Sequence, residues 1–274
     1  AVDTLVSGVH FPSDAGADGV GYRSLAVNLS DLAAMGAEPA CFTLALTLPE
    51  ANSQWLEGFS RGLFEMAKQH RVPLVGGDTT RGPLTISIQV LGYVPCGQAL
   101  RRDGAHPGDL IYVSGYLGDA AAGLALTSAV GDAQAYLQQR FLRPEPRLAV
   151  GLALRNLAHA AIDISDGLLA DVGHIAERSG LCAIIEVDKL TRSSPLTTAF
   201  NQQQAQQFAL CGGDDYELCF CSPPENVGRL AAIAAQLKLP LTCIGEMREG
   251  AGVQLHDRAG KQIETGDRIG YQHF

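Results

Sequence analysis

The sequence contains no stretch that reaches the roughly 18 uninterrupted apolar residues needed for a membrane helix, and it contains no run of Lys or Arg. Acidic residues outnumber basic residues by 29 to 20, so the formal net charge at pH 7 is -9. These features argue against a membrane protein and against a nucleic-acid-binding protein. The chain has 274 residues, of which 46% are hydrophobic and 18% charged, which is an ordinary globular composition and a length that allows two modest domains or one large one; it suits a metabolic enzyme and equally any other cytosolic protein.

The common catalytic and nucleotide-binding motifs are also missing. The sequence has no GxxxxGK[ST] phosphate loop, no strand-GxGxxG-helix pattern, no HExxH, no GxSxG and no kinase HRD motif. No CxxC pair occurs among the seven cysteines, so their spacing does not favour a zinc site. We therefore expect reduced, buried thiols in a cytoplasmic protein, with Cys219 and Cys221 on one face of a strand.

The periodicity of the apolar residues predicts an α+β protein with mixed order of helices and strands. The first half has the order β-α-β-α-β-β, and the polar Gly/Pro segment 101–109 could separate two domains. The expected strands are 1–11, 41–49, 72–75, 84–94, 110–115, 160–166, 181–187, 216–223, 241–247 and 252–257. The expected helices are 17–36, 53–70, 118–126, 148–158, 167–180, 202–213 and 226–238.

The segment 162–172, IDISDGLLADV, carries carboxylates in an otherwise apolar environment. One explanation is that Ser165 or Asp166 caps the following helix. That explanation does not account for Asp163, which stands between two isoleucines, and an unpaired buried carboxylate costs several kcal/mol or is forced to be neutral. Several such carboxylates can converge if a divalent cation neutralises them. Mg²⁺ suits this role because it prefers oxygen ligands and usually links carboxylates to phosphates.

Three other aspartates could belong to the same site, although each also has a simpler interpretation. Asp3 could be a solvated residue at a strand edge, Asp31 an exposed helix residue, and Asp78 a turn residue after the strand 72–75. His10 could be a structural partner, and Arg102 could be an ordinary residue of the linker. None of these residues is decisive alone.

Seven motifs in a fixed order give the sequence a family resemblance. They are VDTLVSGVHF, NLSDLAAMGAEP, VPLVGGDTTRGP, RRDGAHPGD, DISDGLLADV, GGDDYEL and GYQHF. Together they resemble the thiamine-monophosphate kinase family, within the superfamily of aminoimidazole ribonucleotide synthetase and selenophosphate synthetase. The resemblance spans essentially the whole chain.

The resemblance implies a two-domain fold and an ATP-dependent reaction. Residues 1–100 would form an N-terminal domain whose mixed sheet pairs with that of a second copy into a dimeric β-barrel, and residues 101–274 an α+β domain. ATP would lie between the domains, and its phosphoryl group would be transferred to thiamine monophosphate to give thiamine diphosphate. The expected partners are these two substrates and a second copy of the chain, with no nucleic acid and no membrane.

The resemblance also implies roles for individual residues, with several Mg²⁺ ions in place of a catalytic side chain. The expected metal ligands are Asp3, Asp31, Asp78, Asp163 and Asp166. The expected ATP contacts are Gly77, Asp78, Arg102 and Ser165. The expected contacts to thiamine monophosphate are His10, Asp214 and Tyr271.

The sequence departs from the family pattern in two places. Asp214 stands where the family motif usually has Glu, and it is about one methylene shorter. The chain begins at Ala1 with a strand in progress, and we expect a further N-terminal segment that in the family carries a Gly-Asp-Asp motif. Two alternatives stay open: another ATP-dependent member of the superfamily with a different acceptor, or a nucleotide-binding dimer that has lost catalysis.

Overall fold

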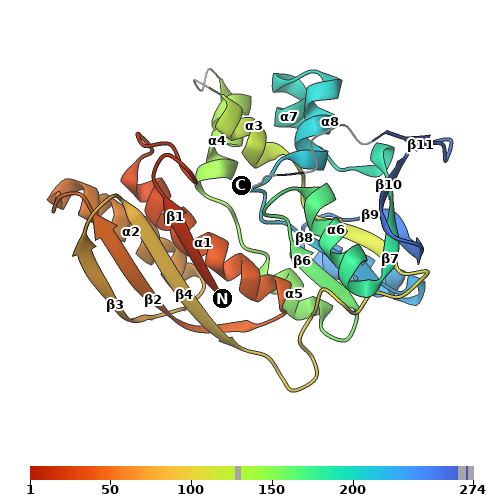
Figure 1. Ribbon diagram of the computed structural model, residues 1–274, viewed down its shortest axis with the longest axis horizontal. Helices are drawn as coiled ribbons and strands as arrows, with labels where there is room; N and C mark the ends of the chain where they lie inside the picture. The colour runs from red at the N-terminus through yellow and green to blue at the C-terminus, as the bar shows by residue number, and fades with distance from the viewer. Residues whose placement is uncertain (127–130, 265–269, 271–274) are drawn as a thin grey trace.

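The computed structural model describes residues 1–126, 131–264 and 270, and it divides into two α+β halves that lie side by side (Figure 1). In the described part of the chain, no helix has both the length and the apolar character needed to cross a membrane. Both sheets are mixed, so the expected two-domain α+β class is confirmed. The expected barrel needs the sheet of a second chain and stays a prediction; within the described residues of one chain, each sheet is open.

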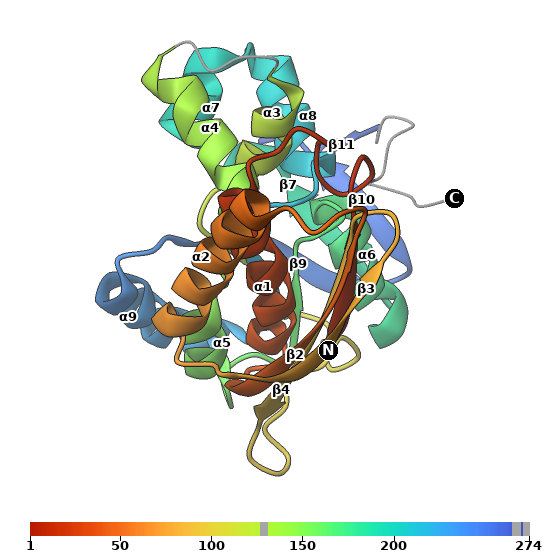
Figure 2. The ribbon, with the colours of Figure 1, turned by 90° about the vertical axis from the view of Figure 1, so that its left-hand side faces the viewer.

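The N-terminal half is a four-stranded sheet with the order β1-β4-β2-β3, backed by two helices. Helix α1 lies against the sheet and α2 packs on α1 (Figure 2). Residues Ile86, Ile88 and Val90 alternate along one strand and are buried on the side that faces the helices. The element bounds are β1 Val2–Val6, α1 Ala17–Ala34, β2 Glu38–Leu48, α2 Ser53–Gln69, β3 Leu74–Arg81 and β4 Thr85–Tyr93.

The C-terminal half is a seven-stranded sheet with the order β11-β10-β7-β9-β5-β8-β6. Its strands are β5 Leu110–Ser114, β6 Ala160–Asp163, β7 Leu181–Glu186, β8 Leu218–Ser222, β9 Leu241–Glu249, β10 Gly252–His256 and β11 Gln262–Ile263. Its α-helices are α3 Asp119–Ala125, α4 Asp132–Leu142, α5 Leu148–Leu154, α6 Leu168–Ser179, α7 Ser194–Ala199, α8 Gln202–Cys211 and α9 Val227–Leu237. Two 3₁₀ turns, η1 Val187–Lys189 and η2 Pro224–Asn226, complete the half. Helices α3, α4, α7 and α8 gather at one end of it (Figure 1).

One apolar core joins the two halves. Leu25 and Leu29 of α1 are fully buried in the same cluster as Leu154 of α5, Phe220 of β8 and Leu230 of α9. Each buried leucine or phenylalanine contributes about 1.5–3 kcal/mol relative to an exposed one. Helix α1 is therefore held on one side by the N-terminal sheet and on the other by the C-terminal half.

Periodicity identified most elements correctly, but two segments were assigned wrongly and three elements were missed. The Gly-Gly-Asp segment is not a turn after a strand; it lies inside β3, paired in parallel with β2. Ser165 and Asp166 lie beyond the end of β6 rather than within it. Helices α4 and α7 and strand β11 were not predicted. The expected buried-thiol pattern holds for Cys219 and Cys221, whereas Cys96 is exposed.

Candidate active site: an acid cluster beside a large cavity

Three predicted metal ligands converge where the two halves meet; we call Asp3, Asp31 and Asp163 the acid cluster. Asp3 lies on β1 and Asp31 on α1, close enough that the charge of Asp3 raises the pKa of Asp31. Asp163 is the last residue of β6 and is 4% exposed. Ser30 donates a 2.6 Å hydrogen bond to Oδ2 of Asp163, and the backbone N–H of Asp3 donates to Asn28. Residues on α1 thus bind the carboxylate of Asp163 from one half and the backbone of Asp3 from the other.

The electrostatics of the acid cluster match a cation site. Burial is the largest cause, and repulsion from Asp163 and Asp3 the next, of a rise in the pKa of Asp31 to about 7. Burial also raises the pKa of Asp3 and of Asp163. Protonation is one way to relieve the repulsion, and a bound divalent cation is the other. The donors are oxygen atoms, which Mg²⁺ prefers, so their chemistry suits the expected ion, although their carboxylate oxygens do not all lie within 4.8 Å of one another.

The loop after β6 places two more predicted residues beside the acid cluster. Asp171 of α6 is buried, and its Oδ2 accepts hydrogen bonds from the backbone N–H groups of Ser165, Asp166 and Gly167 at 3.0–3.1 Å. Burial and the nearby Asp163 and Asp166 raise the pKa of Asp171 to about 8. Neither Ser165 nor Asp166 caps the helix, whose N-cap residue is Gly167. The sequence analysis missed Asp171, which holds this loop in place.

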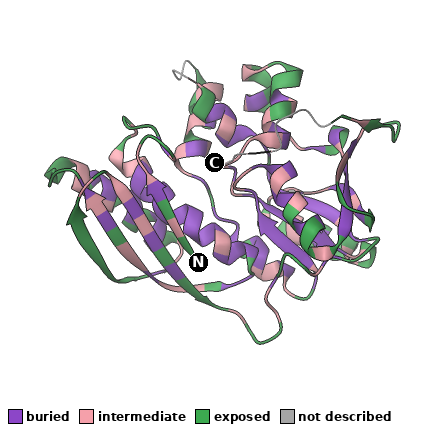
Figure 3. Cartoon of the chain, in the orientation of Figure 1, coloured by how far each residue is buried: buried purple, intermediate pink, exposed green. Residues whose placement is uncertain are grey.

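Gly77 and Asp78 lie away from the acid cluster within one chain. They stand on β3, at the edge of the sheet opposite to Asp3, with β4 and β2 between the two edge strands. Three strand spacings of about 4.8 Å correspond to roughly 14 Å. All eight residues of β3 are exposed (Figure 3). A side chain at Gly77 would come within 1.9 Å of the carbonyl oxygen of Leu44, so glycine is required for the close pairing with β2.

Arg102 lies near enough to the acid cluster to influence it electrostatically. Its charge lowers the pKa values of Asp31 and Asp163, against the larger opposing effect of burial. Its carbonyl oxygen accepts a 3.3 Å hydrogen bond from Ser179. The side chain itself is exposed.

A cavity of about 1040 Å³ opens next to the acid cluster and gathers most of the predicted substrate residues. Asp3, His10, Ser165, Asp166 and Asp214 all contribute to its wall. The backbone N–H of Val6 donates a 2.9 Å hydrogen bond to Nδ1 of His10. Tyr271 lies outside the described residues, although the preceding Gly270 lines the cavity. The volume is in the range typical of small-molecule sites.

The cavity wall also holds a buried arginine that the sequence analysis missed. Arg23 of α1 is 2% exposed and forms an ion pair with Asp214. Its guanidinium lies 4.3 Å from the ring centre of Phe141 and 5.5 Å from that of Tyr216, and it donates a 2.7 Å hydrogen bond to the carbonyl of Phe141. The hydroxyl of Tyr216 donates to Asp214 at 3.4 Å. Asp214 is thereby fixed at the wall, with its side chain 27% exposed.

The other two acids of the GGDDYEL motif have structural partners. Asp215 accepts hydrogen bonds from the N–H groups of Gly118 and Ala120 at 2.6 and 3.1 Å, at the start of α3. Glu217 is buried and forms ion pairs with Arg147 and Arg140. Only Asp214 of the three lines the cavity.

Comparison with known proteins identifies the family of the chain. Residues 1–94 match the family model of the AIR synthase related protein N-terminal domain, and residues 106–258 match that of the C-terminal domain. The thiamine-monophosphate kinase of Salmonella typhimurium is 50% identical over 280 residues, covering all of this chain and 86% of the relative. The chain belongs to the thiamine-monophosphate kinase family.

Two solved structures of this family share the fold. The thiamine-monophosphate kinase from Stenotrophomonas maltophilia K279a has a TM-score of 0.91 at 50% identity, covering 96% of this chain and 85% of the other. The structure of AaThiL complexed with AMPPCP and TMP has a TM-score of 0.89 at 34% identity, covering 100% and 86%. Family members thus share both halves of the fold described above.

Proposed function

We propose that this chain transfers the terminal phosphoryl group of ATP to thiamine monophosphate and so forms thiamine diphosphate. The observation that carries the proposal is the acid cluster, in which acidic residues from both halves influence one another's pKa beside a large cavity that Asp3 lines. Two findings support the identity of the substrates: the chain belongs to the thiamine-monophosphate kinase family, and the solved structure of AaThiL is complexed with AMPPCP and TMP.

The acid cluster, together with Asp166, is proposed to hold Mg²⁺. When bound, the ions offset the repulsion between donor and acceptor phosphates, which is about 4 kcal/mol for two unit charges about 4 Å apart at an effective dielectric of about 20. Two neighbouring side chains hold the proposed ligands in position. Ser30 orients Asp163, and Asp171 orients the loop that carries Asp166. Arg102 and Ser165 are proposed to contact ATP.

The acceptor needs no general base, so no side chain is assigned a catalytic proton transfer. A phosphate monoester has a second pKa near 6 and is already an anionic oxygen nucleophile at neutral pH. The work left to the protein is to align two anions and to exclude water.

The far end of the cavity is proposed to bind the cationic thiazolium part of thiamine monophosphate. Asp214 offers a carboxylate, and aromatic rings such as Tyr216 and Phe208 line the same cavity. Arg23 keeps Asp214 in position and is proposed as a positioning residue. His10 and Tyr271 are the other proposed contacts.

The roles proposed for Gly77 and Asp78 require a second chain, because β3 lies at the far edge of the sheet. The open, fully exposed β3 and the exposed Val2, Val75 and Tyr93 support a homodimer formed through this sheet. Mixing Asp78→Asn with Asp163→Asn chains tests the proposal. With random pairing, half of the dimers are mixed and each has one intact site, so about one quarter of the wild-type activity should return. An inactive mixture, with subunit exchange verified, would place Asp78 in its own chain's site.

The activity itself is tested by following the products. Incubation with ATP, Mg²⁺ and thiamine monophosphate should yield thiamine diphosphate and ADP in equal amounts. Release of ADP and free phosphate without thiamine diphosphate would favour another reaction of the superfamily, and tight binding of AMPPCP without turnover would favour a non-catalytic dimer. None of the cysteines in the described part of the chain forms a disulfide, which supports the cytoplasm as the place of action.

A further inference from the structure

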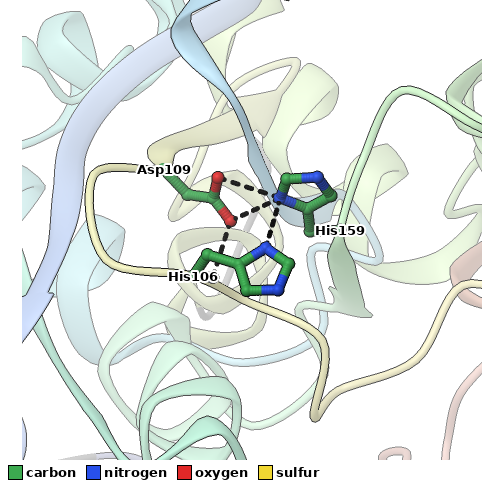
Figure 4. A group of neighbouring side chains, drawn as sticks. All are labelled: His106, Asp109 and His159. Atoms are coloured by element: carbon green, nitrogen blue, oxygen red, sulfur yellow. Dashed lines mark hydrogen bonds and ion pairs between the residues drawn. The ribbon is translucent and has the colours of Figure 1, made fainter.

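A second group of side chains, remote from the cavity wall, has the composition of a transition-metal site. His106, Asp109 and His159, which we call the histidine cluster, face one another in Figure 4. His106 and Asp109 belong to the segment that links the two halves, and His159 directly precedes β6. Asp109 is buried, His106 is exposed and the side chain of His159 is 35% exposed.

In the histidine cluster, Nδ1 of His159 has more close polar neighbours than its single hydrogen can satisfy. Nδ1 of His159 lies 3.0 and 2.9 Å from the two carboxylate oxygens of Asp109 and 3.0 Å from Nδ1 of His106. A ring nitrogen carries at most one hydrogen, so Nδ1 of His159 cannot make a full hydrogen bond to each of these neighbours. Two ligands about 2.1 Å from a common ion, at tetrahedral or octahedral angles, are about 3.0–3.4 Å apart. The observed spacings are close to that range.

The backbone holds this arrangement before any ion binds. The N–H of Gly108 donates to the carbonyl of Met247, and the N–H of Met247 donates to the carbonyl of Asp109, both at 2.8 Å. The N–H of His106 donates to Oδ2 of Asp109 at 2.8 Å, and the N–H of His159 donates to the carbonyl of Cys221 at 2.8 Å. The turn is therefore fixed to β9, and His159 to β8, so little conformational entropy remains to be lost on binding.

We propose that the histidine cluster binds one Zn²⁺-type transition-metal ion through two imidazoles and a carboxylate. Imidazole nitrogen suits zinc, cobalt and nickel, whereas the oxygen donors of the acid cluster suit magnesium, so the two sites select different ions. Three protein ligands with partial exposure leave a coordination position for water. This site is separate from the proposed phosphoryl transfer.

The ion would connect the linker between the halves to the strand that supplies Asp163. The carbonyl of Arg101 already accepts a 3.0 Å hydrogen bond from Ala161 of β6, and the next residue, Arg102, lies near the acid cluster. A metal bound to His106 and His159 adds a second tie between the same two segments. We expect it to stabilise the protein, because an ion that binds only the native state favours that state by mass action.

The test is metal titration of the full chain in excess Mg²⁺, which saturates the oxygen-only acid cluster. A Cys96→Ser background removes the exposed thiol, and Zn²⁺ binding is followed by calorimetry and Co²⁺ binding by visible absorption. We expect one equivalent per chain, a rise in melting temperature, and a loss of affinity of more than about tenfold in His106→Gln and in His159→Gln. The exposed His174 of α6 supplies the control His174→Gln, which should bind as the parent does.

The contrary outcomes are distinct. Equal metal affinity in the parent, His106→Gln and His159→Gln would show that the metal binds elsewhere. The absence of any binding would show that the histidine cluster is only a turn made by His106 and Asp109, with an ion pair between Asp109 and His159. If a variant melts early without metal, Asp109→Asn provides a second test, because it keeps an acceptor for the N–H of His106 and removes the charge. Retained affinity in Asp109→Asn would also overturn the proposal.

Discussion

Replacing Asp163 with asparagine should have opposite effects on stability and on activity. The amide keeps an oxygen that accepts the hydrogen bond from Ser30, so the local packing is preserved. In the metal-free protein at pH 8, the substitution removes a buried charge that repels Asp3 and Asp31. Repulsion between two unit charges about 4 Å apart is about 4 kcal/mol at an effective dielectric of about 20, and proton uptake by Asp31 relieves part of it. A net gain of about 1–3 kcal/mol is expected.

Thermal unfolding in EDTA should then show a melting temperature raised by roughly 2–12 °C, since 1 kcal/mol corresponds to about 2–4 °C in a chain of this size. Formation of thiamine diphosphate should fall by more than about a hundredfold, because even altered partners of metal ligands cost 10–100-fold. The exposed Asp188 provides the control Asp188→Asn, which should change neither quantity. A variant with near-normal turnover would exclude a metal role for Asp163, and a lower melting temperature in EDTA would refute the repulsion argument.

Three further predictions concern other parts of the site. Because the pKa of Asp31 is raised from 3.8 to about 7, the native state keeps a proton that the unfolded chain has lost, so the stability of the metal-free protein should fall as pH rises from about 4 to 7. The melting temperature measured in Mg²⁺ should therefore exceed that measured in EDTA by a margin that widens from pH 4 to pH 7. A constant margin would contradict this prediction. Arg23→Ala should cost about 3–5 kcal/mol by leaving Asp214 unpaired, and it should raise KM for thiamine monophosphate more than KM for ATP, whereas equal changes would exclude a positioning role. Cys219→Ser should lower the melting temperature with kcat unchanged, because the residue is fully buried; loss of turnover at unchanged melting temperature would oppose this.

The sequence predicted those parts of the fold in which apolar periodicity dominates. Helix α1 and strand β4 follow their apolar residues closely. The Gly-Gly-Asp segment was assigned to a turn because its residues favour turns locally, yet pairing with β2 keeps it extended. Helix α7 begins at Ser194 with a proline in its first turn and has only six residues, so its sequence gives little periodic signal. Such elements depend on tertiary contacts that no local pattern records.

The candidate site was predictable to the extent that its residues occur in motifs. Asp3, Asp31 and Asp163 were each ambiguous alone, and the family resemblance linked them before the structure brought them together. Arg23 lies outside those motifs, and Asp171 lies within DISDGLLADV but was given no role, because a buried arginine and a helix aspartate look like surface residues in a sequence. Their roles arise from partners that lie far along the chain or across a turn, namely Asp214 and the backbone of the loop after β6.

The position of the acid cluster follows from the way α1 is packed. Its apolar residues Leu25 and Leu29 enter a core shared by both halves, so the helix cannot shift without disturbing either sheet. Asp31 and Ser30 lie on this helix next to carboxylates from β1 and β6. Close packing in such a core resists small displacements, and phosphoryl transfer depends on alignment within a fraction of an ångström. The fused core is thus the physical reason that acidic residues from β1 and β6 are held in one place, where the metal site is proposed.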